Sequence, residues 1–101
     1  MKMLGKRALE SSLEDYYRQA VRRAGGKTRK LAGEIHDPDQ LTIWPARPVA
    51  AVHFVELKRP GEKPRPGQAR KIARLRAWGC TATYLDTKAA IDLYVAAWRN
   101  G

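Results

Sequence analysis

Three residues of this chain have the types and spacing that metal-assisted hydrolysis requires. Asp39 follows Pro38 just before one strand-like segment, and Glu56 and Lys58 stand two positions apart at the end of another. Mg²⁺ binds oxygen ligands at about 2.0–2.1 Å and keeps several waters. Asp39, Glu56 and the backbone carbonyl of Leu57 can supply part of that coordination. A neighbouring lysine can position or help deprotonate an attacking water, or stabilise charge on a phosphate.

The charge balance indicates a polyanionic partner. The chain has 101 residues, with 20 Lys and Arg against 10 Asp and Glu and a net charge of +10. Nucleic acid is the first candidate partner. A metal-dependent nuclease uses both signs of charge, because carboxylates hold the metal and cations hold the phosphate backbone. The alternative is that the acids only balance charge on a solvated surface. The single cysteine, Cys80, excludes an internal disulfide framework and a multi-Cys zinc site.

Hydrophobic periodicity predicts the elements that must position these residues. We expect helices at 8–24, 67–78 and 87–99, and strands at 27–31, 40–44, 49–58 and 81–85. Gly25-Gly26 ends the first helix and Gly79 ends the second. The order α-β-β-β-α-β-α predicts an α/β fold with a small mixed β-sheet flanked by helices, as one domain over residues 1–101.

The segment 49–58 is the clearest strand, and its nearly continuous apolar run predicts a central strand covered on both faces. Alternation places Ala50, Val52 and Phe54 on the face that carries Glu56 and Lys58, so a buried apolar row is expected to lead to an acid and a base. If this strand pairs with 40–44 as a hairpin, the carboxylates at 39 and 56 meet at one end of the sheet. Two close carboxylates repel each other unless a cation lies between them.

Two other features can contribute to such a site. Gln68 shares the apolar stripe of its helix with Ile72 and Leu75, where a polar side chain needs a partner. The alternative for Gln68 is a capping role near the helix start. Glu10 and Glu14 share one edge of the first helix. We favour Glu14, because it lies nearer the middle of that helix, whereas Glu10 near the first turn favours the helix dipole.

The combination of Pro-Asp, E-x-K on a buried strand and a basic Pro-rich loop resembles the PD-(D/E)-x-K nuclease superfamily. Within it, the chain is similar to stand-alone VRR-Nuc (virus-type replication-repair nuclease) domains over essentially its whole length. The similar stretches are ESSLEDYYRQAVRRAGGKTRK, DPDQLTIWP, VHFVELKRPGEKPRPGQ and IARLRAWGCTATYL. They carry a glutamate-bearing helix, a Gly-Gly, a lysine at Lys30, the strand ending in E-L-K, and a Pro-Gly loop followed by a glutamine.

The resemblance implies a restriction-endonuclease-like core and a structure-selective DNA endonuclease. Such an enzyme depends on Mg²⁺ or Mn²⁺ and hydrolyses phosphodiester bonds, in branched DNA such as Holliday junctions. The resemblance implies metal ligation by Asp39 and Glu56, with Lys58 as the catalytic lysine. A first-helix glutamate would hold a water on the metal or a second ion, and Gln68 would lie at the edge of the site.

The chain departs from the family pattern beside Pro-Asp. His36 and Asp37 stand where the family has a glycine and a small apolar residue, and Gln40 stands where it has an arginine. Asp37 can join the metal ligands or point to solvent, and we favour solvent. Cations are concentrated in two basic segments, 16–33 and 58–76. The nucleic-acid contacts expected from them are Lys30, Arg59, Lys63, Arg65, Arg70, Lys71 and Arg74.

The expected assembly is a homodimer, because two symmetric cuts across a junction need two sites. Apolar flanks at Leu93 and Tyr94, and at Tyr16 and Tyr17, are the predicted interface. No run of about 18 apolar residues and no secretory signal is present. We therefore expect the cytoplasm of a bacterial or phage-infected cell. The alternative functions are a non-catalytic basic nucleic-acid-binding module and an RNA nuclease.

Overall fold

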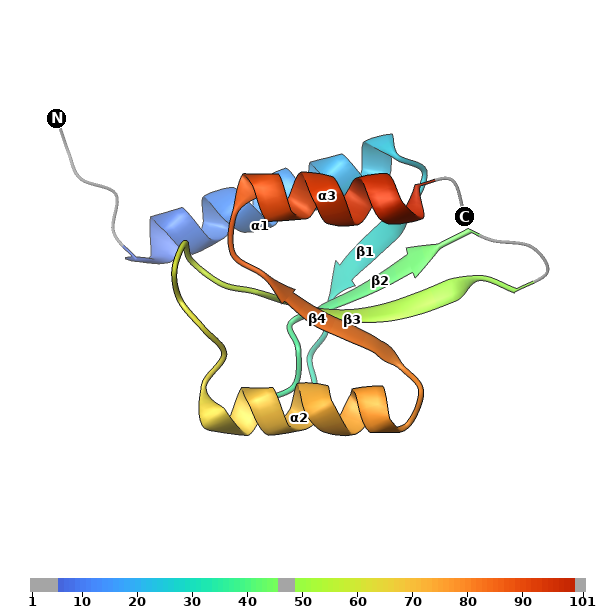
Figure 1. Ribbon diagram of the computed structural model, residues 1–101. Helices are drawn as coiled ribbons and strands as arrows, with labels where there is room; N and C mark the ends of the chain where they lie inside the picture. The colour runs from blue at the N-terminus through green and yellow to red at the C-terminus, as the bar shows by residue number, and fades with distance from the viewer. Residues whose placement is uncertain (1–5, 46–48, 100–101) are drawn as a thin grey trace, which may run out of the picture.

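A computed structural model of the chain describes residues 6–45 and 49–99, with side chains from residue 12 onward. Its elements are α1 (Lys6–Arg23), β1 (Lys27–Lys30), β2 (Gln40–Trp44), β3 (Ala51–Leu57), α2 (Pro66–Ala77), β4 (Thr81–Leu85) and α3 (Lys88–Trp98) (Figure 1). The predicted order α-β-β-β-α-β-α is therefore confirmed. Within these described ranges, no helix is both long and apolar enough to cross a membrane.

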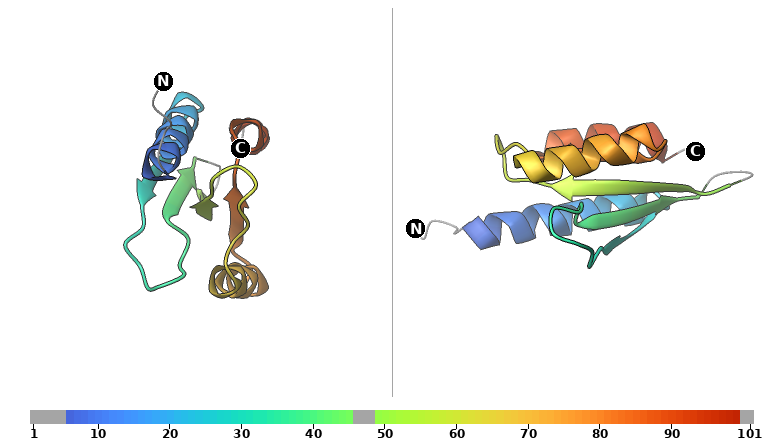
Figure 2. Two further views of the ribbon diagram at one scale, coloured as in Figure 1. Left: turned by 90° about the vertical axis from the view of Figure 1, so that its left-hand side faces the viewer. Right: turned by 90° about the horizontal axis from the view of Figure 1, so that it is seen from below.

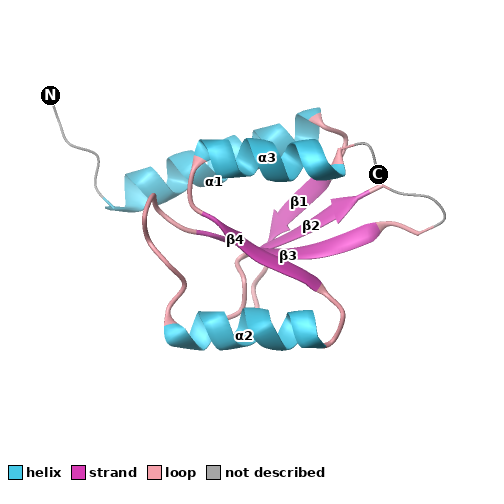
Figure 3. Ribbon diagram, viewed as in Figure 1, coloured by secondary structure: helices cyan, strands magenta, loops and turns pink. Residues whose placement is uncertain are grey.

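The fold has three layers, with α1 and α3 on one face of the sheet and α2 on the other (Figure 3). The strand order is β1-β2-β3-β4, in which β1, β2 and β3 are antiparallel neighbours and β4 is parallel to β3. This confirms the predicted mixed sheet. The α2 helix supplies the crossover that two parallel strands need. The segment joining β1 to β2 extends on the same side of the sheet as α2 (Figure 2).

The main core lies between the sheet and the α1–α3 pair. It contains the fully buried Tyr17 and Val21 of α1, Trp44 of β2, Val55 of β3 and Ile91 of α3. The layer between the sheet and α2 is thinner, because α2 contributes one buried residue, Ile72. This helix packs on β4. The two faces of the sheet are therefore unequally covered.

The prediction of a strand at 49–58 covered on both faces was wrong in two respects. The strand is Ala51–Leu57, and Val52 is 46% exposed while Phe54 is half-buried. The physical reason is that α2 lies against β4 and leaves much of β3 uncovered on that side. The face of β3 that carries Glu56 is thus an open surface that ends in a buried acid.

The α3 helix corrects another expectation. Thr87 caps it by accepting a hydrogen bond from the Ala90 N–H at 3.0 Å, and its Ile91 and Val95 side chains are buried. Tyr94, predicted to lie on an apolar flank, is also buried. Its hydroxyl accepts a hydrogen bond from Trp44 Nε1 at 2.9 Å, which satisfies the polar end of the ring in the core. Leu93 does lie on an open flank and is 75% exposed.

The Gly25-Gly26 turn after α1 confirms the predicted helix end and explains both glycines. Gly25 has a φ of +92°, which an L side chain rarely adopts. A Cβ at Gly26 would come within 2.7 Å of the Trp44 ring. The turn therefore lets the backbone at Gly26 pass close to Trp44 before β1 begins.

Candidate active site

The β2–β3 pairing brings Asp39 and Glu56 together at one end of the sheet. Gln40 pairs with Val55, so Asp39, just before β2, lies opposite Glu56, just after Val55. The Asp39 N–H donates to Glu56 Oε1 at 3.1 Å, and the Leu57 N–H donates to Asp39 Oδ1 at 3.2 Å. The two carboxylates are thus held across the hairpin, as the predicted strand pairing requires.

Glu56 is held on its other oxygen by two side chains. Lys58 Nζ lies 3.1 Å from Glu56 Oε2, and Gln68 Nε2 donates to the same oxygen at 3.0 Å. Glu56 and Lys58 are both buried, at 5% and 8% exposed. A buried ion pair is retained only where extra hydrogen bonds satisfy it. Glu56, Lys58 and Gln68 therefore form one fixed cluster on β3 and α2.

Gln68 fulfils both roles weighed for it in the sequence. Its Oε1 accepts the backbone N–H of Arg65 at 3.0 Å, which caps the start of α2. Its Nε2 reaches Glu56 from that same position. One amide thus couples the start of α2 to the carboxylate at the end of β3.

The electrostatics of Asp39 show that this pair of acids is under strain. Burial, and after it the charge of Glu56, raise the pKa of Asp39 to about 7. The Leu57 N–H and the charge of Lys30 lower this pKa, while the charge of Glu14 raises it. Glu14 and Lys30 are therefore both electrostatic neighbours of Asp39.

Glu14 of α1 is tied to this end of the sheet. Gln40 Nε2 lies 3.4 Å from Glu14 Oε1, and Arg18 binds the same oxygen at 2.6 Å. The side chain of Glu10 lies outside the described residues, so the preference for Glu14 over Glu10 stays a prediction.

Gln40 is a residue whose part in the site the sequence did not indicate. It is completely buried. Besides facing Glu14, its Oε1 accepts a hydrogen bond from Thr28 Oγ1 at 3.2 Å. Thr28 Oγ1 lies 2.8 Å from Thr42 Oγ1, which lies 2.6 Å from the Tyr17 hydroxyl. The available signal was the polar alternation of Gln40 and Thr42 at the start of an otherwise apolar strand.

The other predicted residues separate into groups. Lys71 binds Glu34 at 3.0 Å and Asp37 at 3.1 Å. Asp37 therefore does not join the acid pair. The prediction that it points to solvent was also wrong, because it is paired with Lys71. Arg59 pairs with Glu62 at 2.8 Å in the loop after β3. The structure does not bring all the predicted cations to one place: Lys63 lines a separate cavity beside β4, and Arg70, Lys71 and Arg74 line one face of α2.

The donor set at the acid pair suits a hard divalent cation. No described residue hydrogen-bonds to Asp39 Oδ2, and Glu56 Oε1 accepts one bond although an oxygen has two lone pairs. A cation between the carboxylates would relieve the repulsion that raises the pKa of Asp39. Among the described side chains, no group of three or more His, Cys, Asp or Glu is placed to hold a metal. Coordination would therefore need backbone oxygen, such as the Leu57 carbonyl, and water.

Comparisons with known proteins identify the family. No family model matches the chain. It is 41% identical over 81 residues to "Putative nuclease p44" of Acyrthosiphon pisum secondary endosymbiont phage 1, spanning 78% of this chain and 84% of that protein. A solved "VRR_NUC domain" matches with a TM-score of 0.76 and 28% identity, over 88% of this chain and 96% of the other. A "VRR_NUC domain protein" matches in fold, with a TM-score of 0.72 and 14% identity, over 97% and 90%. The chain therefore belongs to the VRR-Nuc family.

Proposed function

We propose that the chain is a divalent-metal-dependent endonuclease that hydrolyses phosphodiester bonds in branched DNA such as Holliday junctions. The observation that carries the proposal is the pair of Asp39 and Glu56, whose carboxylates accept backbone hydrogen bonds across the β2–β3 hairpin, with the buried Lys58 beside Glu56. Membership of the VRR-Nuc family supports a nuclease. Oxygen donors of this kind favour Mg²⁺ or Mn²⁺ over softer metals.

Each residue of the cluster has a part in the proposed reaction. A divalent cation bound by Asp39 and Glu56 would stabilise charge on the phosphate and on the leaving oxygen. Lys58 Nζ lies 3.1 Å from Glu56 Oε2, where it orients the attacking water or stabilises the phosphate. Gln68 fixes the rotamer of Glu56 through its 3.0 Å hydrogen bond. Glu14 adds negative charge next to Asp39, which strengthens cation binding.

The substrate class follows from the charge and the size of the chain. A net charge of +10 on 101 residues favours phosphate contacts over base readout. Selectivity for the shape of the DNA is therefore proposed over selectivity for its sequence.

The experiment that tests this function compares substrates and variants. Wild-type protein is incubated with a four-way junction, a linear duplex, a single strand and an RNA duplex, with Mg²⁺, Mn²⁺ or EDTA. We expect metal-dependent cleavage of the junction, and its loss in Asp39→Asn, Glu56→Gln and Lys58→Ala. Asp92→Asn is the matched control, because its oxygen can still accept from Tyr16 across α1 and α3. Preferred cleavage of RNA would reassign the substrate, and binding without any cleavage would favour a non-catalytic module.

We propose further that the active form is a homodimer that uses the outer face of α3. Leu93 is 75% exposed there, whereas Tyr94 and Tyr17 are buried in the core, so their prediction as interface residues was wrong. A twofold dimer supplies the two sites that symmetric cleavage needs. Light scattering should give a dimer for the wild type and a monomer for Leu93→Asp. A monomeric wild type at tens of micromolar would contradict this assembly.

A further inference from the structure

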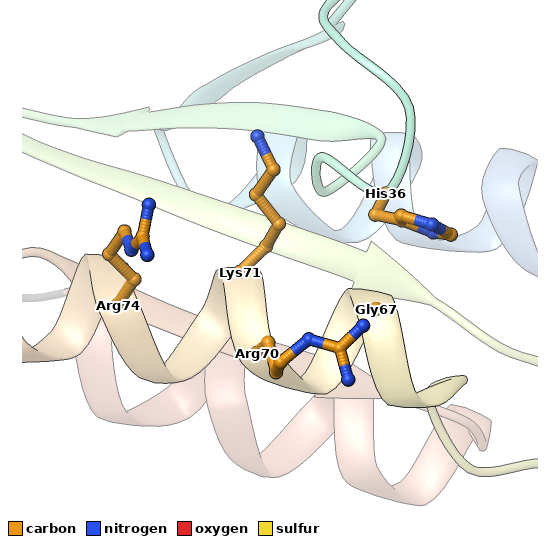
Figure 4. A pocket seen from close by; sticks show the side chains of 5 residues that line it. All are labelled: His36, Gly67, Arg70, Lys71 and Arg74. Atoms are coloured by element: carbon orange, nitrogen blue, oxygen red, sulfur yellow. The ribbon is translucent and has the colours of Figure 1, made fainter.

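A basic cavity lies beside α2, apart from the carboxylate cluster. It has a volume of about 200 Å³ and is lined by His36, Gly67, Arg70, Lys71 and Arg74. His36 comes from the segment between β1 and β2, and the other four come from one face of α2 (Figure 4). Apart from Gly67, every lining residue has a side chain that carries nitrogen. The cavity therefore offers hydrogen-bond donors and no carboxylate.

Two of its cations have no protein partner among the described residues. Neither Arg70 nor Arg74 forms an ion pair or a side-chain hydrogen bond with any residue in the described ranges. Lys71, in contrast, binds Glu34 and Asp37. A second cavity of about 380 Å³ contains these acids together with Lys71, Arg74 and Trp78. Both acids line this second cavity and neither lines the first, so an anion is favoured at the His36 end.

The His36 end is shaped by backbone constraints. His36 has a φ of +72°, a left-handed conformation that histidine adopts more readily than most residues. Its ring lies directly against α2, because a Cβ at Gly67 would come within 2.6 Å of it. Gly67 also belongs to the first turn of a 12-residue helix, where backbone N–H groups and the helix dipole favour negative charge.

The cavity and the proposed active site share the start of α2. Gln68, which bonds to Glu56, follows Gly67 in the chain. Arg74 is six residues farther along α2, or roughly 9 Å at 1.5 Å per residue. A strand whose scissile phosphate lies at Glu56 would therefore carry its neighbouring phosphates along this face of α2.

We propose that this cavity is a phosphate subsite that binds a backbone phosphate of the cleaved strand next to the scissile one. Arg70 and Arg74 supply the charge, while His36 and the start of α2 supply further donors. The proposal rests on the proposed nuclease function, because it places the strand relative to Glu56. The subsite orients the strand and does not contact the reacting atoms.

The test is binding of a synthetic four-way junction in EDTA, measured by fluorescence anisotropy. The variants are Arg70→Ala/Arg74→Ala and the matched control Arg22→Ala/Arg23→Ala, which removes equal charge from the end of α1 across the sheet. We expect the α2 variant to bind at least about tenfold more weakly, as loss of charged hydrogen bonds predicts. Its slope of log affinity against log salt should fall by about 2. The control should leave that slope nearly unchanged.

The second arm locates the phosphate. The wild-type cut is mapped first, and junctions are then made with single methylphosphonates at successive positions around it. A neutral linkage at one or two positions next to the cut should weaken wild-type binding and leave the α2 variant unaffected, because the two losses are coupled. Losses that simply add at every position would overturn the subsite. An arginine-dependent loss seen only when a 5′-terminal phosphate is removed would also overturn it, in favour of end recognition.

These outcomes are distinct from failure of the proposed function. Because EDTA is present, the binding comparison of the first arm does not depend on cleavage, and only the placement of the methylphosphonates in the second arm does. If the wild type binds no junction, the proposed function fails together with the subsite. If the wild type binds but the arginines and phosphates are uncoupled, only the subsite is wrong. His36→Asn tolerates the left-handed backbone and serves as a milder variant if the double variant fails to fold.

Discussion

Asp39 and Glu56 are linked by hydrogen bonds across the β2–β3 hairpin. The Asp39 N–H donates to Glu56 Oε1, and the N–H of Leu57, the residue after Glu56, donates to Asp39 Oδ1. This arrangement holds two acids side by side even though their charges repel. The strain appears in the pKa of Asp39, which burial and Glu56 raise to about 7. An arrangement that is unfavourable without a cation is typical of a site that binds one.

The first prediction concerns stability against pH without metal. The folded-state pKa of Asp39 is raised from 3.8 to about 7, so its stabilising contribution is complete below about pH 4 and is lost as the pH rises through about 7. Asp39→Asn lacks this loss. Thermal unfolding in EDTA should therefore show Asp39→Asn gaining on the wild type between about pH 4 and 8. Parallel curves for the two proteins would contradict the raised pKa.

The second prediction concerns metal binding without substrate. Mg²⁺ binds the ionised carboxylate, so it should stabilise the wild type more at pH 8 than at pH 5. At about 100 times Kd the gain is about 2.7 kcal/mol, which corresponds to about 11–22 °C in Tm for a domain of this size. Glu56→Gln should lose the gain, whereas Asp92→Asn should keep it. An equal gain in Glu56→Gln would place the ion elsewhere.

The fold could be predicted because its signals are local. Apolar alternation and glycine turns defined all seven elements, and the hairpin of 40–44 with the next strand brought Asp39 to Glu56. Coverage of β3 could not be predicted, since it depends on where α2 packs, and α2 lies on β4. Tyr94 was misplaced for a similar reason: its partners Trp44 and His53 lie far away in sequence. Gln40 was interpreted only as a residue that replaces the arginine of the family pattern. Its contacts with Glu14 and Thr28 depend on the tertiary fold and could not be predicted from the sequence.

The third prediction concerns that buried amide. Gln40→Leu removes the hydrogen bond from Thr28 and the donor that faces Glu14, although Thr28 keeps the Leu41 carbonyl and Glu14 keeps Arg18. Two lost bonds at about 0.5–1.5 kcal/mol each should lower the unfolding free energy by about 1–3 kcal/mol. Gln19→Leu makes the same change at an exposed position of α1 and should stay within about 0.5 kcal/mol of the wild type. Urea unfolding of both variants measures the difference. Equal effects would mean that the buried network contributes no net stability.

The fourth prediction separates the two helix glutamates. Glu14 raises the pKa of Asp39, so it lies within electrostatic reach of the acid pair. Glu14→Ala should therefore weaken Mg²⁺-dependent cleavage and Glu10→Ala should leave it nearly unchanged, in rates measured on the same junction. Loss of activity in Glu10→Ala alone would reverse the assignment.

The most direct test of the account is metal back-titration of junction cleavage on one sample. Wild-type protein is stripped with EDTA, and the rate of junction nicking is then followed as free Mg²⁺ is restored. The account predicts no cleavage without metal, a saturable return of activity with Mg²⁺, and no return in Glu56→Gln. Cleavage by the stripped protein, or full recovery in Glu56→Gln, would contradict a reaction that depends on a cation held by Asp39 and Glu56.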